Sequence, residues 1–537
     1  MLRPDLYDVR VSSPESVVAE VQAGLQPLET AANAAWWASS TDATDENEQR
    51  RTASDIARSD YLARPGRMEE ITAARACANL DPLVARQLDV LHDLCLPHQI
   101  PGEQRRRLVE LQVSIESTFA THRGVVAGDE VDDNFIRGIL RTGEDPGERR
   151  EAWEASKTVG AQVSDRVREL AHLRNACARA LGHRDHFAFS LATDELDERR
   201  LMATLEVVES ETRAPFEKWK GGLDTVLADR FGCAPGDLRP YHYEDPFFQE
   251  APAATGVDLD EWFAAGEIEG LSRRTFAGLG LEVDAILARS DLWSREAKSQ
   301  HAFCIDIDRS GDVRVLCNIV GNEQWTETML HELGHAVYFD LVDRSLPWLL
   351  RDMHSLSTEG IAIMFGGLVH DPEWLATVPG IPADTLDGLR PRLAAARRSA
   401  LLVFARWALV MTHFERGLYA DPDADHDTIW WDLVERFQLV HRPDRTAPDW
   451  AAKIHLAVAP VYYQNYMYGQ MVAAQWRAAL RRECGGIVDR PEAGRILTER
   501  FFRPGAALRW DHLIERATGA PLSPAAMTAE LTADTTE

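Results

Sequence analysis

Two histidines four residues apart flank a glutamate in the segment His331-Glu332-Leu333-Gly334-His335. Residues i and i+4 of an α-helix lie on the same face, so both imidazoles can bind one metal ion. Glu332 points partly toward the same ion, where its carboxylate can accept a proton from a water molecule that attacks a carbonyl. The spacing predicts a catalytic metal site in which Glu332 is the general base and later the proton donor.

A catalytic zinc ion has three protein ligands and one open position. The metzincin pattern would need a glycine and a histidine where the chain has Tyr338 and Leu341, so that class is excluded. Glu359 is the best third ligand. It stands at the start of a helix with an apolar face, where a carboxylate is otherwise unfavourable. Two imidazoles and one carboxylate favour a single Zn²⁺, although ligand type alone also admits manganese or cobalt. The alternative third ligands are Asp340, Asp343 and Asp352.

The elements around this motif can be predicted from hydrophobic periodicity. Alternating apolar residues over 303–307 and 313–319, separated by Asp308-Arg309-Ser310-Gly311, predict a β-hairpin. Asn322 is a plausible N-cap for an amphipathic helix that carries the two histidines. After Pro347, the segment Ser357-Thr358-Glu359 opens a second helix. A hairpin followed directly by two helices should therefore position the site.

The rest of the chain is predicted to be helical. From Pro14 to about Gln300, apolar residues recur at helical spacing between Gly, Pro and Asp residues. The polar stretch Ser39 to Thr52 is interpreted as a solvated connector, with a mobile lid as the alternative. No repeat or low-complexity linker divides the chain.

Composition excludes several classes of protein. The 537 residues are 45% hydrophobic and 27% charged, as in an ordinary globular protein. A formal net charge of −28 makes nucleic acid a poor partner. No signal peptide or membrane span is recognised, and the 7 cysteines form no CxxC pair. We therefore expect a protein of the reducing cytoplasm without a membrane partner.

Three separated segments together resemble the helical gluzincin peptidases, namely the thimet oligopeptidase/oligopeptidase F and angiotensin-converting enzyme families. They are Lys298-Ser299-Gln300-His301-Ala302-Phe303-Cys304, Met329-Leu330-His331-Glu332-Leu333-Gly334-His335 and Ser357-Thr358-Glu359-Gly360-Ile361-Ala362. Weaker likenesses at Ala35-Trp36-Trp37 and over 510–519 extend the resemblance over almost the whole chain.

A fourth segment, Lys453-Ile454-His455 followed by Pro460, Tyr462, Tyr463 and Tyr466, looks like the part of these families that binds the transition state and the substrate C-terminus. The resemblance places oxyanion stabilisation on His455 and on Tyr466 or Tyr463. The alternative is that the tyrosines are a core stripe. The His455-to-tyrosine spacing differs from both families, and Asn465 stands where converting enzymes carry a chloride-binding Arg, so chloride activation is not expected through that position.

Substrate binding is also implied by the resemblance. Lys453, one of only five lysines in the sequence, stands where converting enzymes bind the terminal carboxylate of the substrate, and a point charge there favours free C-termini. Its alternative is a solvated surface lysine. His301 and Ala302 would pair with the backbone of an extended peptide, with a buried edge strand as the alternative. Tyr462 is a further candidate substrate contact.

These observations predict a mostly α, two-lobed helical metallopeptidase with a deep central cleft and a small β-hairpin beside the zinc helix. The chain is expected to be a single peptidase unit over 1–537, with a mainly helical lobe over 1–290 and a zinc-binding region with C-terminal helices over 291–537, the lobes interleaving. The expected substrates are short peptides, cleaved by release of C-terminal dipeptides or as by an oligopeptidase. The alternative function is a peptidase-like scaffold specialised for one metabolite or for peptide binding without general proteolysis. A purely structural zinc site lacks a fourth Cys or His ligand. The sequence does not indicate an oligomeric state.

Overall fold

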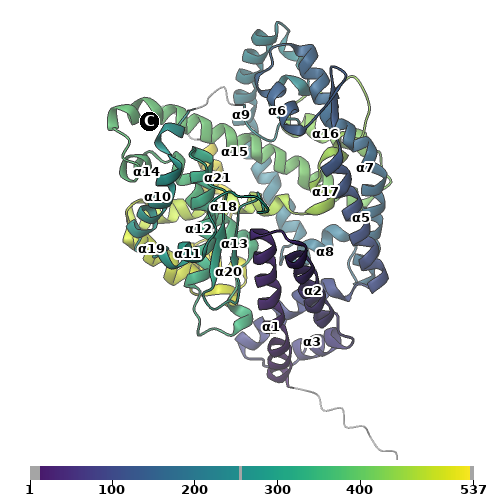
Figure 1. Cartoon of the computed structure of the whole chain (residues 1–537), viewed down its shortest axis with the longest axis vertical. Coiled ribbons are helices and arrows are strands. Elements are labelled where there is room, and N and C mark those ends of the chain that lie inside the picture. Colours follow the sequence, from purple (N-terminus) through teal and green to yellow (C-terminus); the bar gives the residue numbers. More distant parts are fainter. Residues whose placement is uncertain (1–12, 253–256, 533–537) are drawn as a thin grey trace, which may run out of the picture.

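The computed structural model describes residues 13–252 and 257–532. Within these residues it contains the α-helices α1 to α21 and two small antiparallel sheets of two strands each (Figure 1). The predicted mostly α fold is confirmed. None of the helices in the described part of the chain is long and apolar enough to cross a membrane.

The elements before the hairpin are nearly all helical. The α-helices there are α1 (Pro14–Thr41), α2 (Asp45–Leu62), α3 (Arg67–Arg75), α4 (Pro82–Cys95), α5 (Gly102–Thr121), α6 (Asp133–Thr142), α7 (Pro146–Ala180), α8 (His186–Thr193), α9 (Glu198–Phe231), α10 (Ala265–Gly278) and α11 (Asp284–Arg289). Short 3-10 helices join them at η1 (Leu96–Gln99), η2 (Pro235–Asp237), η3 (Pro240–His242) and η5 (Asp260–Trp262). The first sheet pairs β1 (Gly124–Val126) with β2 (Asp129–Val131).

The second part of the chain contains the predicted hairpin and the helices that follow it. The hairpin pairs β3 (Phe303–Asp306) with β4 (Val313–Leu316). The α-helices are α12 (Glu323–Leu341), α13 (Ser355–Gly366), α14 (Pro372–Thr377), α15 (Ala383–Ala420), α16 (His426–Gln438), α17 (His455–Val458), α18 (Tyr463–Cys484), α19 (Pro491–Leu497), α20 (Trp510–Thr518) and α21 (Ala525–Thr532). The short helical turns are η6 (Trp348–Leu350), η7 (Gly367–His370), η8 (Asp449–Ala452), η9 (Thr498–Phe502) and η10 (Gly505–Ala507).

Helix α13 packs against both α12 and α18 near the middle of the molecule (Figure 1). Glycines at the contacts let their backbones approach closely. A Cβ on Gly334 of α12 would lie 3.0 Å from the Ala362 Cα of α13, and a Cβ on Gly469 of α18 would lie 3.0 Å from the Glu359 Cγ. A larger residue at either position would push the helices apart.

One large hydrophobic core runs from Leu111 to Leu531 and includes residues of all three of these helices. A separate small cluster lies beneath α1, α3 and α4 and includes Trp348 and Leu349. Helices α1 and α2, the purple pair in Figure 1, pack side by side, and α1 also contacts β3. There the Trp36 ring stacks on Phe303 with centroids 4.7 Å apart.

Three local predictions differ from the structure. The stretch Ser39 to Thr52 is mostly helical rather than a connector, since α1 extends to Thr41 and α2 begins at Asp45, after the Thr44 side chain accepts a hydrogen bond from Asn47 N. The alternative that it is a mobile lid stays a prediction. The hairpin β1–β2 was not predicted, because its strands have only three residues each. Helix α13 begins at Ser355 rather than Ser357, because the His354 ring accepts a hydrogen bond from Leu356 N.

Candidate active site

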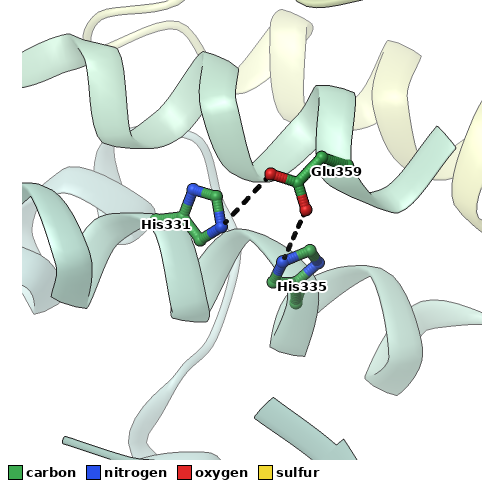
Figure 2. Close-up of side chains that lie close together, drawn as sticks. All are labelled: His331, His335 and Glu359. Carbon is green, nitrogen blue, oxygen red and sulfur yellow. Dashed lines mark ion pairs between the residues drawn. The ribbon is translucent and has the colours of Figure 1, made fainter. Parts of the chain in front are cut away.

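The predicted metal ligands lie together. Helix α12 begins after Asn322, whose side chain accepts a hydrogen bond from Trp325 N, and carries His331 and His335 on one face. Glu359 lies in the second turn of α13 and points at both rings (Figure 2). The His331 Nε2 and His335 Nε2 atoms each lie 3.8 Å from a different oxygen of the Glu359 carboxylate.

These donor atoms fit a metal ion. One ligand atom from each residue lies within 4.8 Å of the others, and about 3.4 Å is the expected separation around a tetrahedral zinc with bonds of 2.0–2.2 Å. The 3.8 Å gaps are too long for hydrogen bonds, so the three groups converge without pairing directly. A small contraction around a cation would complete the set.

Burial adjusts the charge of the three ligands. Desolvation lowers the pKa of His331 to about 4 and that of His335 to about 3. The neighbouring His331 contributes to the lowering of the His335 pKa. Both imidazoles are thus neutral at pH 7, which is the form that binds metals. Burial also raises the pKa of Glu359 to about 7. A bound cation would stabilise its ionised form.

Thr358 orients one of the ligands. Its Oγ1 lies 2.6 Å from His335 Nδ1. When Nε2 binds a metal, Nδ1 carries the proton and its N–H donates a hydrogen bond to the Thr358 hydroxyl oxygen, which fixes the ring orientation. Sequence reasoning did not assign this role to Thr358.

Glu332 lies beside the ligand cluster and next to the hairpin. Its side chain is almost fully buried. Burial and the nearby Glu359 carboxylate raise the pKa of Glu332 to about 8, whereas a hydrogen bond from the Cys304 backbone N–H lowers it. The backbone of β3 therefore contacts the predicted general base, and this contact was not foreseen from the sequence.

The predicted peptide-binding strand residues precede β3. His301 is exposed and Ala302 is half-buried, so the alternative of a buried strand does not describe His301. Strand β3 pairs with β4 on one side only among the described strands. Its other edge has backbone groups that a peptide can pair with.

The alternative third ligands are paired elsewhere. Asp340 contacts Arg344 at 3.1 Å, Asp343 contacts Arg503 at 2.9 Å, and Asp352 contacts Arg309 at 2.9 Å. None of the three carboxylates belongs to the His331, His335 and Glu359 cluster. Glu359 is therefore the carboxylate that the fold places at the two histidines.

Lys453 is buried, so it is not a solvated surface residue. Its Nζ donates a hydrogen bond to Gln249 Oε1 at 2.6 Å and lies 5.8 Å from the centroid of the Tyr463 ring. Burial lowers the pKa of Lys453 to about 8. Gln249 comes from a distant loop and was missed by sequence reasoning, because a single glutamine after two phenylalanines has no recognisable pattern.

The tyrosines divide between two places. Tyr463 lies beside Lys453 and His455. The ring centroids of Tyr463 and His455 are 5.4 Å apart. Burial, together with the Glu359 charge, raises the pKa of both Tyr462 and Tyr466. Tyr462 and Tyr466 are thus close enough to Glu359 to sense its charge, whereas Tyr463 lies beside Lys453.

His455 is held as a neutral ring. Burial and the Lys453 charge lower its pKa to about 4. Its Nδ1 is buried and has no hydrogen-bond partner among the described residues. A neutral imidazole can still donate one hydrogen bond through its N–H.

A buried network shapes the segment that carries these side chains. Val461 has a φ of 55°, which is unusual for a β-branched residue. The Glu415 carboxylate on α15 accepts a hydrogen bond from Val461 N at 2.7 Å, and Arg174 of α7 donates to Leu456 O at 2.8 Å. These residues were not singled out from the sequence, because they lie far from the motif along the chain.

The comparison with known protein families adds an independent observation. A family model described as angiotensin-converting enzyme matches residues 11–218. The matched range ends before His331, so it does not rest on the ligand cluster. No curated protein matches the chain. The family match supports a zinc metallopeptidase of the angiotensin-converting enzyme type.

Proposed function

We propose that this chain is a zinc-dependent metallopeptidase that releases dipeptides from the free C-termini of short peptides. The observation that carries the proposal is the convergence of His331, His335 and Glu359 beside the buried carboxylate of Glu332. The family match over residues 11–218 supports the same class of reaction.

In this proposal, His331, His335 and Glu359 hold the zinc ion, which when bound polarises the scissile carbonyl and lowers the pKa of water. Glu332 accepts a proton from the attacking water as the new C–O bond forms. It then gives the proton to the amide nitrogen as the C–N bond breaks. A carboxyl group whose pKa is raised toward neutrality suits both steps.

Two donors are proposed to stabilise the negative oxygen of the tetrahedral intermediate. His455 and Tyr466 are assigned this role, since Tyr466 is close enough to Glu359 to sense its charge whereas Tyr463 lies beside Lys453. A donor placed at a developing oxyanion typically contributes roughly 10²–10³ in rate.

Lys453, Gln249 and Tyr463 are proposed to bind the terminal carboxylate of the substrate. Lys453 supplies the charge, and Gln249 holds its ammonium in place. Gln249, which contacts Lys453, also lines a cavity of about 550 Å³ that reaches His331. The part of the peptide between the Lys453 anchor and the zinc ligands is proposed to contact His301, Ala302 and Tyr462. A fixed carboxylate anchor favours removal of a short C-terminal piece over internal cleavage.

The test is mass spectrometry of short peptides with free or amidated C-termini, incubated with the zinc-loaded protein with and without a chelator. Chelator-sensitive release of dipeptides from free C-termini alone is expected. Internal cuts that ignore amidation would instead indicate an oligopeptidase. Absence of any cleavage would contradict the peptidase proposal and favour a scaffold specialised for one metabolite or for peptide binding.

A further inference from the structure

The cavity beside His331 contains a carboxylate to which the reaction assigns no role. The cavity measures about 550 Å³, a typical size for a ligand site, and its lining includes Glu327, His331, Gln249, His370 and Gln470. Glu327 precedes His331 by one turn of α12, so the two side chains lie on the same face of the helix. The carboxylate of Glu327 is therefore a neighbour of a proposed metal ligand.

Helix packing directs both side chains into the cavity. A Cβ on Gly366 would lie 3.3 Å from the His331 Cβ and 3.4 Å from the Glu327 Cγ. The end of α13 thus rests on the stems of these two side chains, and both residues line the cavity. Any larger residue at position 366 would have to displace one of the stems.

Glu327 has no counter-charge of its own. Among the described residues, its carboxylate makes no hydrogen bond or ion pair within the distances that define them. The cavity lining also includes the cations His370, Arg397 and Arg477, and each of them is paired with a carboxylate other than Glu327. His370 contacts Glu323 at 2.5 Å, and Arg477 and Arg397 contact Glu530 at 2.8 and 3.2 Å. A cation from outside would find Glu327 available.

The surroundings of Glu327 resemble a binding site more than open solvent. Its side chain is accessible to water. Even so, enclosure by protein raises its pKa, and Glu323 adds to the shift while His370 opposes it. Because the side chain keeps its contact with water, its unpaired carboxylate is available to a ligand cation, which can form a charge-assisted hydrogen bond with it. Glu250 adds a second carboxylate to the same cavity lining.

The cavity lies on the carboxy-terminal side of the scissile bond in the proposed function, on which this inference rests. Gln249 contacts Lys453, the proposed anchor for the terminal carboxylate, and lines the same cavity as Glu327. A side chain of the departing dipeptide would therefore enter the space that Glu327 faces.

We propose that Glu327 is a specificity-determining residue that selects substrates with a lysine or arginine side chain in the C-terminal dipeptide. The carboxylate would form a charge-assisted hydrogen bond with the substrate cation, and an uncharged side chain of similar size would leave it unpaired.

The first test compares pentapeptides with free C-termini that differ only at one of the last two positions, which holds lysine, arginine, norleucine or glutamate. Norleucine matches the lysine stem without its charge. We expect kcat/KM for the lysine or arginine peptide to exceed that for norleucine by 10-fold or more, which is about the effect of one charge-assisted hydrogen bond. Glu327→Gln should reduce the ratio to near one, and Glu327→Lys should favour the glutamate peptide.

The matched control is Asp340→Asn. It makes the same change in net charge on the same helix, but Asp340 lies about 20 Å along α12 from Glu327 and contacts Arg344. Because the whole chain has a formal net charge of −28, this control separates a local contact from general attraction of cations. An equal loss of preference in Asp340→Asn would overturn the assignment to Glu327.

A second test does not depend on turnover. Calorimetric binding of the dipeptides Lys-Leu, Leu-Lys and their norleucine counterparts is measured for the wild type and for Glu327→Gln. Cleavage with no preference for cationic side chains would overturn this inference and leave the peptidase proposal standing. Absence of cleavage together with Glu327-dependent binding of the lysine dipeptides would overturn the peptidase proposal and support the subsite. Absence of both would overturn both.

Discussion

At the scale of single residues, the site depends on burial that sets the protonation of each group. The two histidines proposed as zinc ligands are neutral because they are desolvated, and Glu332 holds its proton more tightly than an exposed glutamate. Burial also favours the neutral form of Lys453 and lowers its pKa. These shifts lead to two predictions.

Glu332→Gln should retain the metal and lose turnover. The amide is nearly the same size as the carboxylate but accepts no proton, so kcat is expected to fall by about 10²–10⁴. Zinc content by mass spectrometry should equal that of the wild type, because His331, His335 and Glu359 are unchanged. A variant with a rate near that of the wild type would remove Glu332 from the proposed mechanism.

The preference for free C-termini should depend on pH through Lys453. Its ammonium has a pKa of about 8 and is charged below that value, so the preference should be full at pH 6–7 and decline as the pH rises through about 8. The measurement is the ratio of kcat/KM for free and amidated forms of one peptide, since kcat/KM reports groups of the free enzyme. Lys453→Met should have a low ratio at every pH. A ratio that stays constant from pH 6 to 9 in the wild type would exclude this role.

At the scale of elements, close contacts between helices decide where the ligands lie. Glu359 approaches α12 because α12, α13 and α18 meet at glycines. The segment before α18 has its conformation fixed by buried side chains of α7 and α15. A change in either contact should alter the site without touching a ligand.

Gly360→Ala should destabilise the protein and weaken zinc binding. The new Cβ would lie 2.4 Å from the Val472 Cγ1, so α13 and α18 must separate, at a cost of about 1–3 kcal/mol. Thermal unfolding with and without zinc should show a lower Tm and a smaller zinc-induced increase. Gly417→Ala in α15 is the control, since its Cβ would meet nothing within 4 Å, and it should be neutral or stabilising.

Glu415→Gln should change how stability depends on pH. Burial raises the pKa of Glu415 from its ordinary value of 4.5 to about 8, so the folded protein holds a proton that the unfolded chain releases. The stability of the wild type should therefore fall as the pH rises from about 5 to about 8. The glutamine can still accept the Val461 N–H bond without ionising, so its Tm relative to the wild type should increase over that range. A Tm difference that is independent of pH would contradict the raised pKa.

At the scale of the whole molecule, the helices are divided between unequal cores. Most of the apolar residues belong to one continuous cluster, whereas α1, α3 and α4 enclose a small one of their own. Regions with fewer buried contacts open at lower free energy. Helix α1 nevertheless covers β3 through the stacked rings of Trp36 and Phe303, so this small unit lies over the strand next to the site.

Hydrogen exchange followed by mass spectrometry should distinguish the two units. We expect the amides of α1 to α4 to exchange faster than those of α12, α13 and α18, because α1 to α4 bury less apolar surface. Zinc should slow exchange in α12 and α13, which carry the ligands, and leave α1 to α4 nearly unchanged. Equal exchange throughout would mean that the protein opens as one cooperative body.

The sequence by itself was sufficient for the local part of this protein. The positions of His331 and His335 on one face, the hairpin before them and the cap at Asn322 all follow from spacing and periodicity within a short segment. The mostly α fold follows from the same kind of signal. Local hydrogen bonds and helical geometry determine these features, so neighbouring residues are enough to predict them.

Only the tertiary structure decided which distant groups meet. It brought Glu359 to the histidines by packing α13 on α12, whereas Asp340, Asp343 and Asp352 lie at arginines elsewhere. It also brought Gln249 to Lys453, Glu415 to Val461 and an unpaired Glu327 into the cavity beside His331. These contacts depend on how closely whole helices pack, and that packing is set by side-chain volumes summed over many residues far apart in the chain.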